Sequence, residues 1–259
     1  MSNVSDDEDD TTAGLFQEPD DFYLPEKQPT SVEHRMLNGQ VLTLRLVGHS
    51  PLWGHLLWNA GRTIADYLET HGTALIQHKR VLELGAGAGL PSIIAALGDA
   101  ACVVVTDYPD AELIENLRVN VEGNCREGHD VHAEGYLWGA DITSLTSYLP
   151  DEDRAAGFDV LILADLLFNH SEHGKLVSSI QQTLRKSHDS QALVFFTPYR
   201  PWLFDKDMAF FDLARHAGFV VEKILEKTLE KVMFDEDPGD ELLRRTVFGY
   251  SLRWSEQAL

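Results

Sequence analysis

From residue 80 onward, short runs of apolar residues alternate with longer segments in which apolar residues recur every three or four positions. The short runs indicate buried strands, and the longer segments indicate amphipathic helices. We expect strands at 80–85, 102–107, 132–137, 158–165 and 192–199. We expect helices at 90–98, 109–121, 176–185 and 208–219. This alternation predicts an α/β, Rossmann-like fold whose mostly parallel sheet carries helices on both faces.

An amphipathic helix is also expected ahead of the first strand, from residue 52 onward. Its apolar positions keep helical spacing and are Trp53, Leu56, Leu57, Ala60, Ile64 and Leu68. One face of such a helix would pack against the sheet. The same pattern places Trp58 on this helix.

The C-terminal part of the chain breaks the alternation. Two strand-like runs, 220–232 and 245–254, follow each other with no helix of comparable length between them. They flank an acidic turn at 235–241 that carries five acids in seven residues. Two consecutive strands joined by a turn predict a terminal antiparallel hairpin. A Rossmann dehydrogenase does not normally end in this way.

Composition divides the chain into three parts. Residues 1–14 are polar and acidic, with five acids at 6–10, and predict a disordered tail. Residues 15–48 are expected to form an arm followed by a short strand or hairpin. Residues 49–259 carry the alternating pattern and are expected to form one domain.

The arm has its own expected structure. Residues 15–35 combine aromatic residues with three prolines, which favours an extended segment over a helix or strand. Three aromatic residues are candidates for docking on the domain: Phe16, Phe22 and Tyr23. Residues 36–48 then predict a short strand or a hairpin around the Asn38-Gly39 turn.

Charge limits the class of partner. The formal net charge is −21 and the isoelectric point is about 4.7. A nucleic-acid-binding face would have to form against this repulsive field, so we expect no nucleic-acid partner. The acidity would attract a basic macromolecule, or it only keeps the protein soluble; composition does not decide between these.

Sequence features also bear on location. The N-terminus carries acids where a secretory signal carries bases and an apolar core. No apolar run approaches the roughly 20 residues of a transmembrane helix. Cys102 and Cys125 form no CxxC pair and no disulfide framework. We therefore expect a cytoplasmic protein with no membrane attachment, and we expect a monomer.

The strongest chemical signal lies at the end of the first predicted strand. Glu83-Leu-Gly85-Ala-Gly87-Ala-Gly89 stands at a strand-to-helix junction, where glycines let the backbone turn sharply and approach a ligand. Asp107 ends the next strand, where a carboxylate can accept hydrogen bonds from both hydroxyls of a ribose. The pattern suits NAD and S-adenosylmethionine equally, because both contain an adenosine ribose. The alternative for Asp107 is a helix cap.

Two tryptophans stand near the same region of the predicted fold. Trp58 lies in LLWNAG, and Trp138 follows the third strand in YLWG. An aromatic residue after the third strand can pack against an adenine. Spacing alone favours core packing for both.

Five sequence blocks, taken in order, resemble one family. They are SPLWGHLLWNAG, VLELGAGAGLPS, VVTDYPD, LWG and LADLLFNHSEH. The chain resembles the seven-strand, class I protein methyltransferases of the lysine methyltransferase-like family over roughly residues 15–254. Members of this family have seven strands, the last inserted antiparallel. ADLLFNHSEHGKL and the LFQEPDDF arm are similar to a fungal branch of the family, formerly described as nicotinamide N-methyltransferase-like.

The resemblance implies a function and a site. It implies S-adenosyl-L-methionine as cofactor and methylation of the N-terminal glycine and adjacent lysine of translation elongation factor 1A. It implies that these residues bind the cofactor: Trp58, Gly85, Ala86, Gly87, Asp107, Trp138 and Ala164. Asp165 is expected to position the amine and Phe168 to line its path, without a metal ion.

Phe168 departs from the family pattern. Relatives that modify internal lysines usually carry Asp-x-x-Tyr after the fourth strand, whereas this chain has Asp165-Leu-Leu-Phe168. Phe168 has no hydroxyl to hydrogen-bond an amine, although its ring face can attract a cation. The departure agrees with the N-terminal branch.

Several other residues are weaker candidates for a functional role. His170 and His173 could form a metal pair, but no third ligand accompanies them. Asn169 and His170 could contact a substrate, and Tyr199 could line an amine channel. Loop packing explains each as well. The acidic turn at 235–241 is a solvated hairpin or a dock for a basic substrate.

Three other functions remain possible from the sequence. The first is a nicotinamide-type N-methyltransferase acting on a small molecule. The second is a module that binds the cofactor without catalysis and assists assembly of a partner. The third, an NAD oxidoreductase, is disfavoured by Glu83, by the terminal hairpin and by the lack of a second domain.

Overall fold

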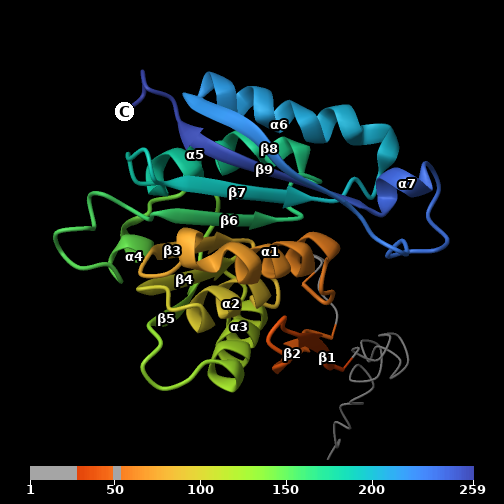
Figure 1. Ribbon diagram of the computed structural model, residues 1–259, viewed down its shortest axis with the longest axis horizontal. Helices are drawn as coiled ribbons and strands as arrows, with labels where there is room; N and C mark the ends of the chain where they lie inside the picture. The colour runs from red at the N-terminus through yellow and green to blue at the C-terminus, as the bar shows by residue number, and fades with distance from the viewer. Residues whose placement is uncertain (1–27, 49–53) are drawn as a thin grey trace, which may run out of the picture.

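A seven-stranded sheet divides the molecule into two helical layers in the computed structural model, which describes residues 28–48 and 54–259 (Figure 1). The strands lie in the order β5-β4-β3-β6-β7-β9-β8. Their bounds are β3 Arg80–Leu84, β4 Cys102–Asp107, β5 Val131–Gly135, β6 Val160–Ala164, β7 Gln191–Phe196, β8 Phe219–Thr228 and β9 Thr246–Trp254. β3 to β7 run parallel to one another, whereas β9 is inserted antiparallel between β7 and β8. The predicted sheet and its terminal antiparallel hairpin are confirmed.

The helices lie on both faces of the sheet. They are α1 Asn59–Leu75, α2 Leu90–Leu97, α3 Ala111–Asn124, α4 Thr143–Thr146, α5 His173–Thr183, α6 Phe204–His216 and α7 Glu241–Arg244, with 3-10 turns η1 His170–Glu172 and η2 Pro201–Leu203. In Figure 1, α5 and α6 lie toward the top of the view, and α1 to α3 lie toward the bottom. Among the described residues, no helix is long and apolar enough to cross a membrane.

Successive residues of the central strands enter different layers. Val81 and Ile162 pack with α1 and α2, whereas Leu82 and Leu161 pack with α5 and α6. Because both faces are covered, these strands are nearly continuous apolar runs. Burial of each such side chain contributes about 1.5–3 kcal/mol relative to exposure.

The first helix begins later than its hydrophobic pattern predicts. α1 starts at Asn59, so Leu57 and Trp58 precede it, and Trp53 lies outside the described residues. The amide of Ala60 in its first turn donates to Asp165 Oδ2 at 2.8 Å. A carboxylate from a distant strand end therefore satisfies this helix start, which periodicity along the helix cannot reveal.

A separate hairpin precedes the domain. β1 (Thr30–Arg35) pairs antiparallel with β2 (Val41–Leu46) around the Asn38-Gly39 turn, where Gly39 has φ of 89°. The expectation of an extended arm to residue 35 is therefore wrong for β1, because the strand after the turn gives it a pairing partner. Phe16, Phe22 and Tyr23 lie outside the described residues.

Asparagines of α3 connect this hairpin to the glycine loop. Asn120 Oδ1 accepts from the amide of Arg45 at 2.7 Å, and Asn120 Nδ2 donates to the carbonyls of Arg45 and Ala88. Asn124 bonds Thr43 of the same strand in the same two-way manner. The two asparagine side chains thus satisfy backbone groups at the edge of β2, and Asn120 also binds the loop after β3 through the Ala88 carbonyl.

Candidate active site

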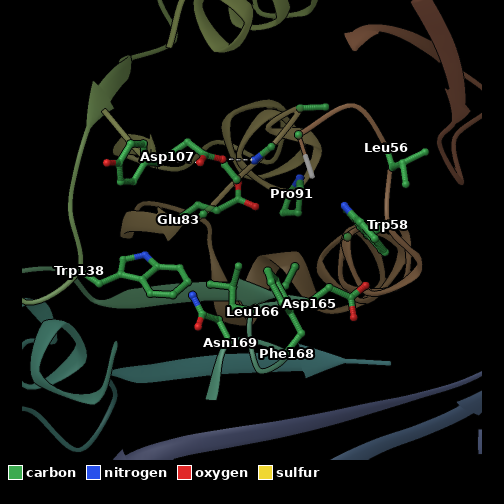
Figure 2. Close-up of a pocket in the computed structure, with 18 of the residues that line it drawn as sticks. Leu56, Trp58, Glu83, Pro91, Asp107, Trp138, Asp165, Leu166, Phe168 and Asn169 are labelled. Carbon is green, nitrogen blue, oxygen red and sulfur yellow. Dashed lines mark hydrogen bonds between the residues drawn. The ribbon is translucent and has the colours of Figure 1, made fainter. Parts of the chain in front are cut away.

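A cleft of about 550 Å³ opens at the carboxyl ends of β3, β4, β5 and β6. The strand order reverses on either side of β3, and ligands of open α/β sheets bind at such a switch point. All seven residues predicted to bind the cofactor line this cleft: Trp58, Gly85, Ala86, Gly87, Asp107, Trp138 and Ala164. In Figure 2, Trp138 lies on one side of the cleft and Trp58 with Asp165 on the other.

The loop after β3 requires glycine at Gly85. Its φ is 62°, a left-handed value that side chains disfavour, and a Cβ there would lie 2.6 Å from Leu166 Cδ2. Gly87 has φ of 57°, yet a Cβ would meet nothing within 4 Å. The backbone at Gly87 therefore faces open space in the cleft.

Glu83 stabilises the start of the next helix. Its Oε2 accepts from the amide and the hydroxyl of Ser92, at 3.0 and 2.5 Å. Burial raises the pKa of Glu83 to about 8, although both hydrogen bonds from Ser92 favour the ionised form. Glu83 therefore holds the start of α2 and also forms part of the wall of the cleft.

Asp107 ends β4 beside the glycine loop. Its Oδ2 accepts from the Gly87 amide at 2.6 Å, and its Oδ1 accepts from the Tyr108 amide at 2.6 Å (Figure 2). Burial raises its pKa. The helix-cap role belongs to Asp110, which accepts from Glu112 and Leu113. Each oxygen of Asp107 keeps a lone pair that can accept a further hydrogen bond.

Asp165 joins three elements at the end of β6. Its Oδ1 accepts from the Thr197 amide at 2.7 Å, and its Oδ2 accepts from the Ala60 amide at 2.8 Å and from the Tyr199 hydroxyl at 3.3 Å. Burial raises its pKa to about 7. Its φ of 55° is unusual for a residue with a side chain, and such strain clusters at functional sites. Asp165 therefore holds α1 and β7 in place around the cleft.

A second chamber of about 360 Å³ adjoins the cleft. The two cavities share four lining residues: Trp58, Asp165, Phe168 and Arg200. Phe168, with 44% of its surface exposed, lies at this boundary, and Arg200 donates from its guanidinium to the Phe168 carbonyl at 2.6 Å. A ligand in one cavity can therefore contact a ligand in the other.

Aromatic rings enclose part of the second chamber. Trp58 and Tyr199 lie 5.1 Å apart between ring centroids, and Phe234 lies 6.0 Å from each, with all three pairs edge-on. Tyr199, a candidate from the sequence for lining an amine channel, lines this chamber. Phe234 was not expected from the sequence. The one signal that could have suggested it is its place directly before the acidic turn.

Trp58 and Trp138 combine packing with exposure. Trp138 is partly buried against the core on the α5 side and also lines the cleft. Trp58 lines both cavities. Core packing, which spacing alone favours, therefore describes only part of the role of Trp138.

The two histidines after β6 make separate contacts. His170 Nε2 lies 2.7 Å from Asp207 Oδ1, whereas buried His173 bonds the Leu167 carbonyl at 2.8 Å. Asn169 lines the cleft. In the part of the chain that the structure describes, the side-chain groups that could hold a metal ion are Cys102 with Asp130 and His132, and His34 with Asp66 and Glu69. Neither group includes a residue that lines the two cavities.

Comparisons with known proteins agree with this geometry. A family model described as lysine methyltransferase matches residues 39–216. A protein of Emericella nidulans is 51% identical over 96% of this chain and 98% of its own length, and one of Schizosaccharomyces pombe is 44% identical over 92% and 94%. Both relatives are named protein N-terminal and lysine N-methyltransferase.

Solved structures show the same fold at low identity. The T. thermophilus 16S rRNA N2 G1207 methyltransferase, in complex with AdoMet and guanosine, is 16% identical with a TM-score of 0.52. The match covers 88% of this chain and 51% of that one. At this identity the likeness establishes the fold, not the substrate.

Proposed function

The chain belongs to the lysine methyltransferase family, and from this premise we propose that it methylates the N-terminal glycine and the adjacent lysine of translation elongation factor 1A. The class I methyltransferase fold and the S-adenosyl-L-methionine cofactor are established by the family and its structural neighbours. The predicted methyltransferase activity is confirmed at the level of the family. The substrate protein and the site of methylation are the proposal.

The residues of the cleft fit this cofactor. Gly87 presents open backbone next to Asp107, whose free lone pairs suit a ribose diol. Glu83, Asp107 and Asp165 line a cavity that has to receive a positively charged molecule. Trp138 offers a ring face for an adenine. The bound cofactor supplies an activated methyl group on a positively charged sulfur.

The main structural support for the proposal is that the cleft and the second chamber share lining residues. An amine in the second chamber reaches the cleft past Trp58 and Phe168, so both molecules can be held for an in-line displacement. The aromatic walls remove water from the amine, and loss of water lowers an amine's pKa. The neutral amine, which is the nucleophile, then needs only to be positioned.

The chemistry of the substrate favours a chain terminus. An α-amine has a pKa near 8 and a lysine amine near 10.4, so at neutral pH the neutral fraction of the α-amine is roughly 200-fold larger. A terminal glycine also carries no side chain to place among the rings. These properties support the α-amine as the first acceptor and the adjacent lysine as the second.

Mass spectrometry tests the proposal directly. The enzyme is incubated with S-adenosylmethionine and either elongation factor 1A or a peptide with its N-terminal sequence. Methyl groups are expected on the first two residues, and acetylation of the α-amine should block modification of residue 1. Methylation only at internal lysines, or only of nicotinamide, would refute the proposed substrate and leave the family assignment intact.

Location belongs to the proposal as well. We place the reaction in the cytoplasm, with the enzyme acting as a monomer. The two cysteines support a reducing compartment, because both are free.

A further inference from the structure

Three carboxylates line the second chamber, and they differ in what already binds them. Asp165 accepts hydrogen bonds from two backbone amides and a tyrosine hydroxyl. Asp207 is paired with His170. Asp237, at the exposed rim, has no hydrogen bond or ion pair to any residue within 28–48 and 54–259. Asp237 is thus the carboxylate of the chamber that remains available to a ligand.

The segment that carries Asp237 is held in place at its base. It connects β8 to β9, and Leu229 and Arg245 exchange two hydrogen bonds of 2.8 Å where it begins and ends. The buried side chain of Arg244 donates to the Phe234 carbonyl at 2.8 Å. Phe234 in turn packs against the rings of Trp58 and Tyr199. Asp237 follows Phe234 by three residues, so the same contacts fix its place beside the chamber.

The chamber has the composition of a cation site. Aromatic rings and a free carboxylate together attract an ammonium group. Thr197, whose hydroxyl is buried, adds a second polar residue to the lining of the chamber. Arg200 is the cationic side chain among the described lining residues, and its guanidinium is bound to the Phe168 carbonyl.

We propose that Asp237 binds the ammonium group of a cationic side chain at the second position of the substrate. The inference rests on the proposed function, in which the α-amine of residue 1 lies at the boundary of the two cavities. One residue further along, an extended chain advances by about 3.5 Å. A long basic side chain at that position extends from the boundary toward the rim, where the Asp237 carboxylate lies.

This arrangement makes residue 2 a determinant of specificity. A substrate whose second side chain is apolar keeps the contacts of its α-amine but loses the ion pair at the rim. A substrate whose second side chain is acidic meets a like charge, which disfavours binding. Asp237 therefore acts on substrate affinity, whereas methyl transfer depends on groups at the boundary.

The test compares two peptides that differ in one charge. Both begin with glycine; the second residue is lysine in one and norleucine, which lacks the ammonium group, in the other. Methylation of the α-amine is measured for the wild-type enzyme and for the variants Asp237→Asn, Asp237→Glu and Glu236→Gln. Glu236 is the matched control, since it carries the same charge one residue away and does not line the chamber.

We expect Asp237→Asn to raise KM about 10-fold for the lysine peptide, the effect of one charge-assisted hydrogen bond. Its kcat should stay within twofold, and its KM for the norleucine peptide should not change. Asp237→Glu should restore most of the difference, and Glu236→Gln should behave as wild type. Equal effects of Asp237→Asn on both peptides, or no effect on either, would overturn the role of Asp237. If the wild-type enzyme methylates neither peptide, the proposed function itself is wrong, and this inference is wrong with it.

Discussion

The cofactor cleft and the second chamber adjoin each other, yet they are built in different ways. The cleft takes most of its walls from the carboxyl ends of neighbouring parallel strands, and backbone groups of the glycine loop form part of its surface. The chamber draws its walls from segments far apart in the chain, from Trp58 to Asp237. The strand ends of the sheet thus form most of the cleft, whereas residues of several separate loops, together with Phe196 of β7 and Asp207 of α6, form the chamber.

This difference separates what the family shares from what one member recognises. Strand ends and glycine turns are fixed by the sheet, so they suit the cofactor that all members use. Loops tolerate change, and the residues that choose a substrate are often found on them. We therefore expect substitutions in the two cavities to separate cofactor binding from substrate binding, and the predictions below test this separation.

The largest effect is expected at Asp107. Asp107→Ala removes an acceptor from the cleft and leaves the Gly87 amide without its partner. Loss of hydrogen bonds to a charged group should weaken S-adenosylmethionine binding by about 1.5–3 kcal/mol, or roughly 10- to 150-fold. Calorimetry measures the affinity, and the KM for the protein substrate should stay near the wild-type value.

Asp110→Ala is the matched control for this prediction. Asp110 caps α3 and lies outside the cleft, so its loss should lower the free energy of unfolding by about 1 kcal/mol without weakening the cofactor. Unchanged affinity in a folded Asp107→Ala variant would remove Asp107 from the cofactor site.

The two cavities also differ in how far the sequence could predict them. The cleft was predictable, because Gly85 and Asp107 end strands whose apolar pattern is strong and whose carboxyl ends must meet at one edge of a parallel sheet. The mostly parallel sheet and its antiparallel hairpin followed from the same pattern and from the resemblance. The periodicity of apolar residues shows which face of each element is buried. For these strands, this information is sufficient to predict where the cleft lies.

The chamber was predictable only in part. Asp165, Phe168 and Tyr199 follow strand ends, but Phe234 lies in a loop whose path depends on the Arg244 contact and on ring packing. No local pattern encodes such contacts between distant segments. The start of α1 was misplaced for the same reason, since the amide of Asn59 donates to the Tyr199 hydroxyl and that of Ala60 to Asp165.

A smaller effect, on the opposite cavity, is expected at Phe234. Phe234→Ala removes one ring of the aromatic wall, which both excludes water from the amine and supports the segment that carries Asp237. The KM for the protein substrate should rise about 10-fold, in the range of a lost aromatic contact. Because Phe234 does not line the cleft, the affinity for S-adenosylmethionine should stay within twofold.

Trp202→Ala serves as the control for a surface aromatic. Trp202 is 59% exposed on the neighbouring η2 turn and does not line the chamber. It should leave both KM and cofactor affinity near wild type. If Phe234→Ala weakened the binding of cofactor and substrate alike, the two cavities would be one cooperative unit and would not separate cofactor binding from substrate binding.

The smallest expected effect is a pH dependence of cofactor binding. Burial raises the pKa of Glu83 to about 8 and that of Asp165 to about 7. The folded protein then holds protons that the unfolded chain releases near pH 4, so the free energy of unfolding should fall as pH rises from about 4 to 8. A cation in the cleft favours the ionised carboxylates, and its binding releases those protons. Affinity for S-adenosylmethionine should therefore increase about fivefold between pH 6 and 8 and level off above about pH 9, where Glu83 is fully ionised.

Calorimetry across this pH range, in buffers of different ionisation enthalpy, measures both the affinity and the protons released. S-adenosylhomocysteine lacks the sulfonium charge, so its affinity should change less with pH. Glu83→Gln keeps an acceptor for Ser92 but cannot ionise, and it should flatten the dependence. Glu122→Gln, on the exposed side of α3, should leave it unchanged. An affinity for S-adenosylmethionine that is the same at pH 6 and pH 8 would mean that the buried carboxylates do not respond to the cofactor's charge. In that case their role would be confined to holding α1, α2 and β7 around the cleft.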